Sequence, residues 1–126
     1  MERKVTITAG NITAEAYLLN TSTADAIWDA LPLASTCNLW GDEIYFTIST
    51  SHNLEQNARE IVDKGDLGYW PQGPAFCIFF GRTPISSENE IRPASAVNVF
   101  GKVIGDASIF KQVSSGAPVR VEKTGQ

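Results

Sequence analysis

At 126 residues the chain has the length of one domain, and we expect a single domain over residues 1–126. Hydrophobic residues make up 43% of the sequence and charged residues 19%, a balance typical of a globular protein with one core. The net charge is −4 and the lysines and arginines are scattered, which argues against a nucleic-acid partner. No apolar run is long enough to cross a bilayer and no leader pattern points to export, so we expect a cytoplasmic protein with no membrane partner.

A hairpin is predicted at the start of the chain. Apolar and polar residues alternate over residues 4–8 and again over 12–18, which is the pattern of strands with one buried face. Gly10 and Asn11 lie between the two segments and form a two-residue turn signal.

A short amphipathic helix is predicted over residues 23–31. The preceding residues 20–23 supply N-cap oxygens, apolar side chains then recur at helical spacing, and Pro32 ends the segment. Trp28 is the largest apolar side chain of this helix, and we expect it to plug one mouth of a barrel.

The middle of the chain predicts the most deeply buried strand. Residues 34–39 and 43–49 are strands joined by a turn at 40–42, and a short aromatic segment covers residues 67–70. The most apolar run of the protein follows at residues 75–80, bounded by proline and glycine. Such a run predicts a central strand that is buried on both faces.

The last third predicts a surface excursion, two more strands and a second short helix. Residues 83–95 carry prolines, serines and glutamates typical of a loop on the surface. Residues 97–104 and 119–122 are strands, with Gly101 as a bulge or a point of close approach, and residues 107–113 are a helix.

These elements together predict a mainly β protein: a closed, antiparallel β-barrel of about eight strands with two short helices. Side chains fill the interior of so small a barrel, so we expect any ligand to bind on its outer wall.

Metal and cofactor chemistry finds little support in the sequence. Cys37 and Cys77 both lie in predicted strands and are expected to be buried thiols in a reducing compartment. Two cysteines and one histidine are too few for the common metal sites, and we expect no metal and no other cofactor. His52 lies in a polar loop without a nucleophile or carboxylate in sequence reach, so we do not expect it to be a catalytic base.

Several motifs resemble a known family. Residues 99–103 (VFGKV) and the order of the elements resemble the cyclophilins. Residues 40–46 (WGDEIYF), 65–71 (GDLGYWP) and 79–84 (FFGRTP) resemble more closely the small prokaryotic cyclophilin-like family. That resemblance implies a cyclophilin-type barrel, in a family with no established activity.

The cyclophilin resemblance also implies where a prolyl isomerase would keep its catalytic groups. Cyclophilins aim an arginine at the prolyl amide, and the matching strand at residues 34–39 contains none. The pocket histidine of the family falls at Val97, and its two pocket phenylalanines fall at Phe76 and Cys77. The bulky Tyr69 and Trp70 match the groove floor and are expected to narrow or fill it.

A modified groove is therefore the candidate binding site, and no residue is assigned a catalytic role. Its candidate residues are Trp40, Glu43, Tyr45, Tyr69, Trp70, Phe76 and Arg82. The alternatives are a solvated carboxylate at Glu43, core positions for the aromatic residues and a surface ion pair at Arg82. We expect a binding module for an unidentified small molecule or extended peptide without appreciable prolyl isomerase activity; the alternative is a weak or divergent peptidyl-prolyl isomerase.

Overall fold

A computed structural model describes residues 3–125. Over these residues it contains nine strands, one α-helix and one 3-10 helix. In chain order these are β1 (Arg3–Ala9), β2 (Ile12–Leu18), α1 (Ser22–Ala30), β3 (Leu33–Thr36), β4 (Asn38–Leu39), β5 (Glu43–Thr47), β6 (Asp66–Trp70), β7 (Ala75–Phe79), β8 (Asn98–Val103), η1 (Ala107–Gln112) and β9 (Pro118–Lys123).

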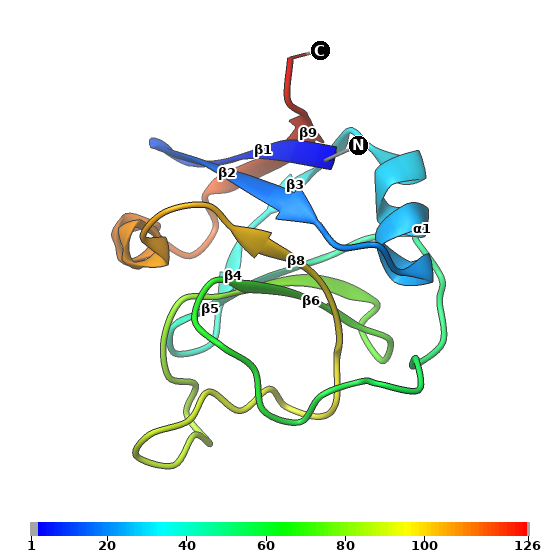
Figure 1. The fold of residues 1–126 in the computed structure, drawn as a ribbon. Coiled ribbons are helices and arrows are strands. Elements are labelled where there is room, and N and C mark those ends of the chain that lie inside the picture. Colours follow the sequence, from blue (N-terminus) through cyan, green and yellow to red (C-terminus); the bar gives the residue numbers. More distant parts are fainter. Residues whose placement is uncertain (1–2, 126) are drawn as a thin grey trace.

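The strands form one antiparallel sheet that is nearly closed into a barrel (Figure 1). The strand order is β3-β9-β1-β2-β8-β6-β7-β5-β4, so β3 and β4 lie at opposite ends of the sheet. Only Cys37 separates these two strands in the chain, and its N–H donates to the carbonyl oxygen of Ala117 over 2.8 Å. The chain therefore bends at Cys37 and connects the two end strands of the sheet directly. The mainly β barrel is confirmed, and the ninth strand arises because this bend divides the single strand predicted at residues 34–39.

Aromatic side chains fill the interior of the barrel. The Phe46 and Phe76 rings stack with their centroids 4.9 Å apart, and Phe100 meets Phe76 edge-on at 5.1 Å. All three side chains are fully buried. The lumen is a packed core, which leaves the outer wall as the place for a ligand.

Strand β7 is buried on both faces, as predicted. Phe76 and Ile78 point into the barrel, whereas Ala75, Cys77 and Phe79 point outward. The outward residues join a second apolar group, the outer cluster, which consists of Val62, Ala75, Cys77, Phe79 and Val97. The polypeptide between β5 and β6 and the loop between β7 and β8 cover it, because backbone bridges join Arg59 to Val97 and Val62 to Ile91.

Helix α1 covers one end of the barrel, but its most deeply buried large side chain is Ile27 and not Trp28 as predicted. The Thr21 hydroxyl accepts a hydrogen bond from the backbone N–H of Ala24 over 3.0 Å and caps the helix. Ala24 and Ile27 are buried, but Trp28 is only partly buried. Lys123 Nζ lies 4.6 Å from the centroid of the Trp28 ring. Ile27 is therefore the more deeply buried side chain of the helix, whereas the partly buried Trp28 ring lies beside Arg3 of β1 and Lys123 of β9.

Strand β8 approaches its neighbours closely at Gly101. A Cβ at this position would lie 2.8 Å from the carbonyl oxygen of Tyr17 and 3.0 Å from Leu67 Cδ1. The register with β6 shifts beside it, since Leu67 pairs with Gly101 and Gly68 pairs with Val99. The expected bulge or close approach is thus confirmed. No helix among the described residues is long and apolar enough to cross a membrane.

We expect Ile27→Ala to destabilise the protein more than Trp28→Ala. The first change removes a fully buried side chain and should cost about 2–5 kcal/mol of unfolding free energy. The second removes a ring that already contacts solvent, so its loss should be smaller. Urea denaturation of both variants measures the difference, and an equal or larger loss in Trp28→Ala would restore the plug role to Trp28.

Candidate functional site

A tight hairpin between β4 and β5 presents one wall of the candidate site. The backbone N–H of Trp40 donates to the carbonyl oxygen of Glu43 over 2.9 Å, and Glu43 donates back to Trp40 over 3.2 Å. Gly41 in the turn has a φ of +60°, and a Cβ there would lie 2.8 Å from the carbonyl oxygen of Arg82. Only glycine fits such a position without strain. The turn thereby brings Trp40 beside the first residue of β5.

The alternation of β5 and β7 sets the orientation of the next three side chains. Glu43 pairs with Phe79, and Tyr45 pairs with Cys77. Residues two apart on a strand share a face, and directly paired residues share it with them. Glu43, Tyr45 and Cys77 therefore all lie on the outer face of the barrel.

The opposite wall is held by hydrogen bonds to serines of the loop between β7 and β8. The Ser86 hydroxyl accepts from the backbone N–H groups of Thr83 and Arg92, both over 2.9 Å. Trp70 Nε1 donates to the hydroxyl of Ser95 over 2.7 Å, which fixes the indole against the loop. These bonds place the segment after Arg92 in front of the sheet.

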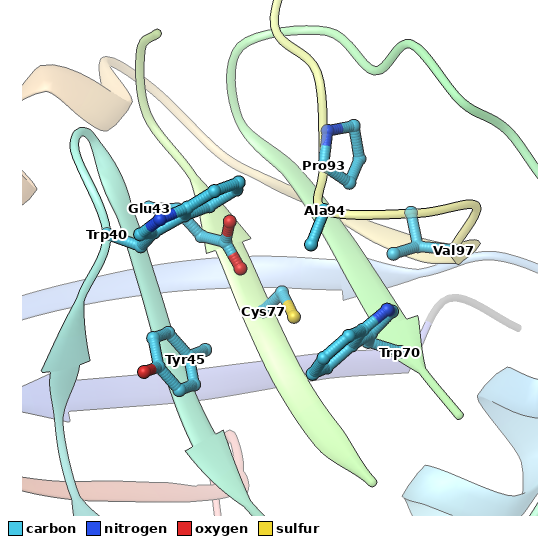
Figure 2. Close-up of a pocket in the computed structure, with 8 residues that line it drawn as sticks. All are labelled: Trp40, Glu43, Tyr45, Trp70, Cys77, Pro93, Ala94 and Val97. Carbon is cyan, nitrogen blue, oxygen red and sulfur yellow. The ribbon is translucent and has the colours of Figure 1, made fainter. Parts of the chain in front are cut away.

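Between the two walls lies a cavity of about 300 Å³ (Figure 2). It is lined by Trp40, Glu43, Tyr45, Trp70, Cys77, Pro93, Ala94 and Val97. Apolar and aromatic surface dominates this lining, and Glu43 contributes its only charged side chain. In Figure 2 the Glu43 carboxyl group projects from β5 toward the space between Trp40, Cys77 and Ala94.

Glu43 is the unusual group of this cavity. It is 6% exposed, and its Oε1 atom is buried without a hydrogen-bond partner among the described residues. Burial raises the pKa of Glu43 to about 7, although a side-chain hydrogen bond with Cys77 lowers this pKa in part. A carboxyl group of this pKa is ionised in a large fraction of molecules near neutral pH.

Cys77 remains a thiol beside this carboxyl group. Burial is the largest cause that raises its pKa well above the ordinary value, and the charge of Glu43 and the hydrogen bond to it add to the effect. A protonated thiol is a hydrogen-bond donor and a poor nucleophile. Cys77 therefore lines the cavity as a thiol that is poorly suited to attack a substrate.

The structure brings four of the seven candidate residues together at the cavity: Trp40, Glu43, Tyr45 and Trp70. Tyr69 and Phe76 point into the barrel instead, and Tyr69 donates its hydroxyl to the carbonyl oxygen of Thr50 over 2.8 Å. Each precedes a residue that lines the cavity, so the period of two along a strand turns it to the opposite face. Arg82 is exposed and lies at a separate depression beside Lys64 and Glu88.

Four lining residues were not among the sequence candidates. Cys77 and Val97 occupy the places where the cyclophilin resemblance put a pocket phenylalanine and the pocket histidine, and this correspondence could have identified both. Pro93 and Ala94 reach the cavity through hydrogen bonds within a long loop, which has no periodic signal in the sequence.

His52 belongs to a polar group at one end of the barrel, away from the cavity lining. Its Nδ1 lies 2.8 Å from the carbonyl oxygen of Asn53, and its backbone N–H donates to the Tyr69 hydroxyl over 3.1 Å. Asn98 Nδ2 donates to the Thr23 hydroxyl over 3.0 Å and to the carbonyl oxygen of Asn53 over 2.8 Å. These satisfied groups tie the loop after β5 to α1 and β8. Over residues 3–125 no cluster of three or more histidine, cysteine or acidic side chains could hold a metal ion.

The family comparison matches almost the entire chain. The family described as cyclophilin-like matches residues 3–122. The chain belongs to the cyclophilin-like family. The curated proteins contain no match to it.

Two solved structures share the fold. One is the solution structure of the hypothetical protein AF2241 from Archaeoglobus fulgidus, which is 43% identical with a TM-score of 0.82; the match covers 98% of this chain and 95% of AF2241. The other is McbB in complex with tryptophan, which is 18% identical with a TM-score of 0.74. That match covers 97% of this chain and 45% of McbB, and at this identity it shows the fold alone.

We expect the buried Glu43 carboxyl group to make stability depend on pH. Its pKa of about 7 lies above the ordinary value of 4.5, so the folded state holds this proton more tightly than the unfolded state. Folding stability should therefore fall as pH rises from about 4.5 through 7, by on the order of 3 kcal/mol from this group. Urea denaturation at about pH 5 and pH 8 should show a smaller fall in Glu43→Gln. Equal pH dependence of the two proteins would contradict the burial of the charge.

Proposed function

We propose that this cyclophilin-like protein binds a small planar molecule carrying a hydrogen-bond donor in the outer-wall cavity. One observation carries this proposal: Glu43 lines an apolar cavity, and its buried Oε1 atom has no hydrogen-bond partner within residues 3–125. An unsatisfied buried polar atom costs roughly 1–3 kcal/mol, and more when it is charged. A ligand N–H group or ammonium group that donates to Glu43 would recover this free energy.

The other walls of the cavity favour a flat aromatic ligand. Trp40, Tyr45 and Trp70 offer ring faces and edges around the space in front of Cys77 (Figure 2). A volume of about 300 Å³ lies at the lower end of ligand pockets, which suits a small molecule. Pro93 and Ala94 form a wall opposite Trp40, so an extended peptide fits this space less well than a compact ligand. Tryptophan, the molecule in the McbB complex, combines a flat ring system with an ammonium group.

The prolyl isomerase alternative has less support. Catalysis needs a donor aimed at the twisting amide, since that nitrogen becomes pyramidal only in the transition state. No arginine lies in β3 or β4, and Val97 stands in the place of the pocket histidine. Glu43 presents a hydrogen-bond acceptor, whereas stabilising this nitrogen needs a donor.

Tryptamine and indolepropionate provide a matched pair of probe ligands with opposite charge. At about pH 8, where Glu43 is mostly ionised, tryptamine should bind and indolepropionate should not. Glu43→Gln should weaken tryptamine binding roughly 10- to 100-fold, because a hydrogen bond to a charged group contributes about 1.5–3 kcal/mol. Isothermal titration calorimetry measures both effects.

Arg82→Ala serves as the control for this experiment, because Arg82 is exposed and lies outside the cavity lining. It should leave tryptamine affinity unchanged. Equal affinity for the two probes, or unchanged binding in Glu43→Gln, would contradict the proposed role of the carboxylate.

We also expect no appreciable prolyl isomerase activity. The missing positioned donor corresponds to a few kcal/mol of transition-state stabilisation. A protease-coupled assay on a proline tetrapeptide should therefore give a kcat/KM far below about 10⁴ M⁻¹s⁻¹. A value at or above that level would favour the isomerase alternative, and its loss in Arg82→Ala would identify a substitute arginine.

A further inference from the structure

We propose that the same cavity is an active site for proton transfer, in which Glu43 removes a proton from a carbon atom of a planar substrate. This inference rests on the proposed function only in that the substrate must occupy the cavity. It goes further because Glu43 takes part in a chemical reaction, whereas the proposed function gives it only a hydrogen bond with a ligand.

The geometry places one carboxyl group at the cavity. Glu43 lines this space, and no described residue donates a hydrogen bond to its buried Oε1 atom. The Cys77 thiol lines the cavity next to the same carboxyl group and partly lowers its pKa. A substrate that is bound in the cavity is already close to this base. The entropy cost of bringing the two together is then part of the binding step and not of the reaction step.

The surroundings also increase the reactivity of the base. A carboxylate that water does not solvate is a stronger base than one on the surface, and a pKa of about 7 lets it accept and release protons near neutral pH. Of the other residues that line the cavity, only Tyr45 and Cys77 can titrate. Two charged groups on the hairpin and the loop, Asp42 and Arg92, do not line the cavity and are paired elsewhere: Asp42 lies 3.9 Å from Lys111, and Arg92 lies 2.9 Å from Glu90.

The proposed step is balanced without a further reagent. Glu43 takes a proton from a C–H bond, and the bond's electron pair moves into a conjugated electron acceptor of the substrate. The protonated carboxyl group then returns the proton to another atom of the same molecule, which gives an isomer, or to water when a bond in the substrate has broken. Trp40 and Trp70 would hold a flat substrate against the carboxylate during this step (Figure 2).

The probe is 5-nitrobenzisoxazole, a flat bicyclic molecule with one acidic ring C–H bond. A base removes this proton, the C–H electrons form a nitrile, and the N–O bond breaks to release a coloured phenolate. We expect saturable turnover that tryptamine inhibits competitively. Removal of the general base in Glu43→Gln should lower kcat/KM by about 10²-fold or more. Arg82→Ala should retain the full rate, and circular dichroism should show that both variants fold.

The pH dependence gives a second readout that does not depend on the Glu43 variant. The rate should rise with pH and level off above about 7, as Glu43 ionises. Cys77→Ala removes the hydrogen bond that lowers the pKa of Glu43, so the midpoint of this profile should move to higher pH. A profile that does not change in Cys77→Ala would contradict the effect of this thiol on the pKa of Glu43.

The outcomes separate this inference from the proposed function. Tryptamine binding without turnover above the rate in free acetate would overturn the proton-transfer proposal and leave ligand binding intact. Turnover that persists in Glu43→Gln would overturn Glu43 as the base. Absence of both binding and turnover would overturn both proposals.

Discussion

The structure depends on one strand that two apolar clusters share. Strand β7 buries Phe76 and Ile78 in the barrel and Cys77 and Phe79 in the outer cluster. Its outward face therefore needs a cover, which the polypeptide between β5 and β6 and the loop between β7 and β8 provide. The cover is incomplete in front of Cys77, where a small thiol stands at the place of a cyclophilin pocket phenylalanine. The candidate cavity lies at this place, with Cys77 and Val97 in its lining.

The burial of the Glu43 carboxylate lowers the stability of the folded barrel. A carboxylate at the start of β5 could have faced solvent, but Trp40 and the facing loop exclude water from it. The barrel tolerates the cost because aromatic packing around Phe76 stabilises the same strands. Perturbed carboxyl groups of this kind cluster at functional sites, where binding or catalysis offsets the lost stability. Here the buried carboxyl oxygen, which has no hydrogen-bond partner in the part of the chain that the structure describes, is the feature that a purely structural role leaves unexplained.

The sequence predicted the fold better than the site, for physical reasons. Alternation identified the strands and placed Glu43 and Tyr45 on one face, and the unbroken apolar run of residues 75–80 predicted burial on both sides. The same alternation argues against Tyr69 and Phe76 as partners of Trp70 and Cys77, since adjacent strand residues face opposite ways. Pro93 and Ala94 could not be predicted, because hydrogen bonds to Ser86 set the course of the loop. The pKa of Glu43 depends on that loop as well.

The cavity also reverses the polarity that the cyclophilin resemblance implies for its groove. An arginine donates to the amide of a prolyl substrate, and a groove built around it recognises acceptors. In this chain the charged group that lines the cavity is Glu43, which accepts hydrogen bonds when it is ionised, and Val97 stands where the resemblance places a histidine donor. Under the proposed function, molecules with exposed donors or acidic protons are favoured, and peptide carbonyl groups would meet an ionised acceptor instead of a donor. A few side chains on the barrel wall would thus, under the proposed function, change the chemistry of the molecules that bind there.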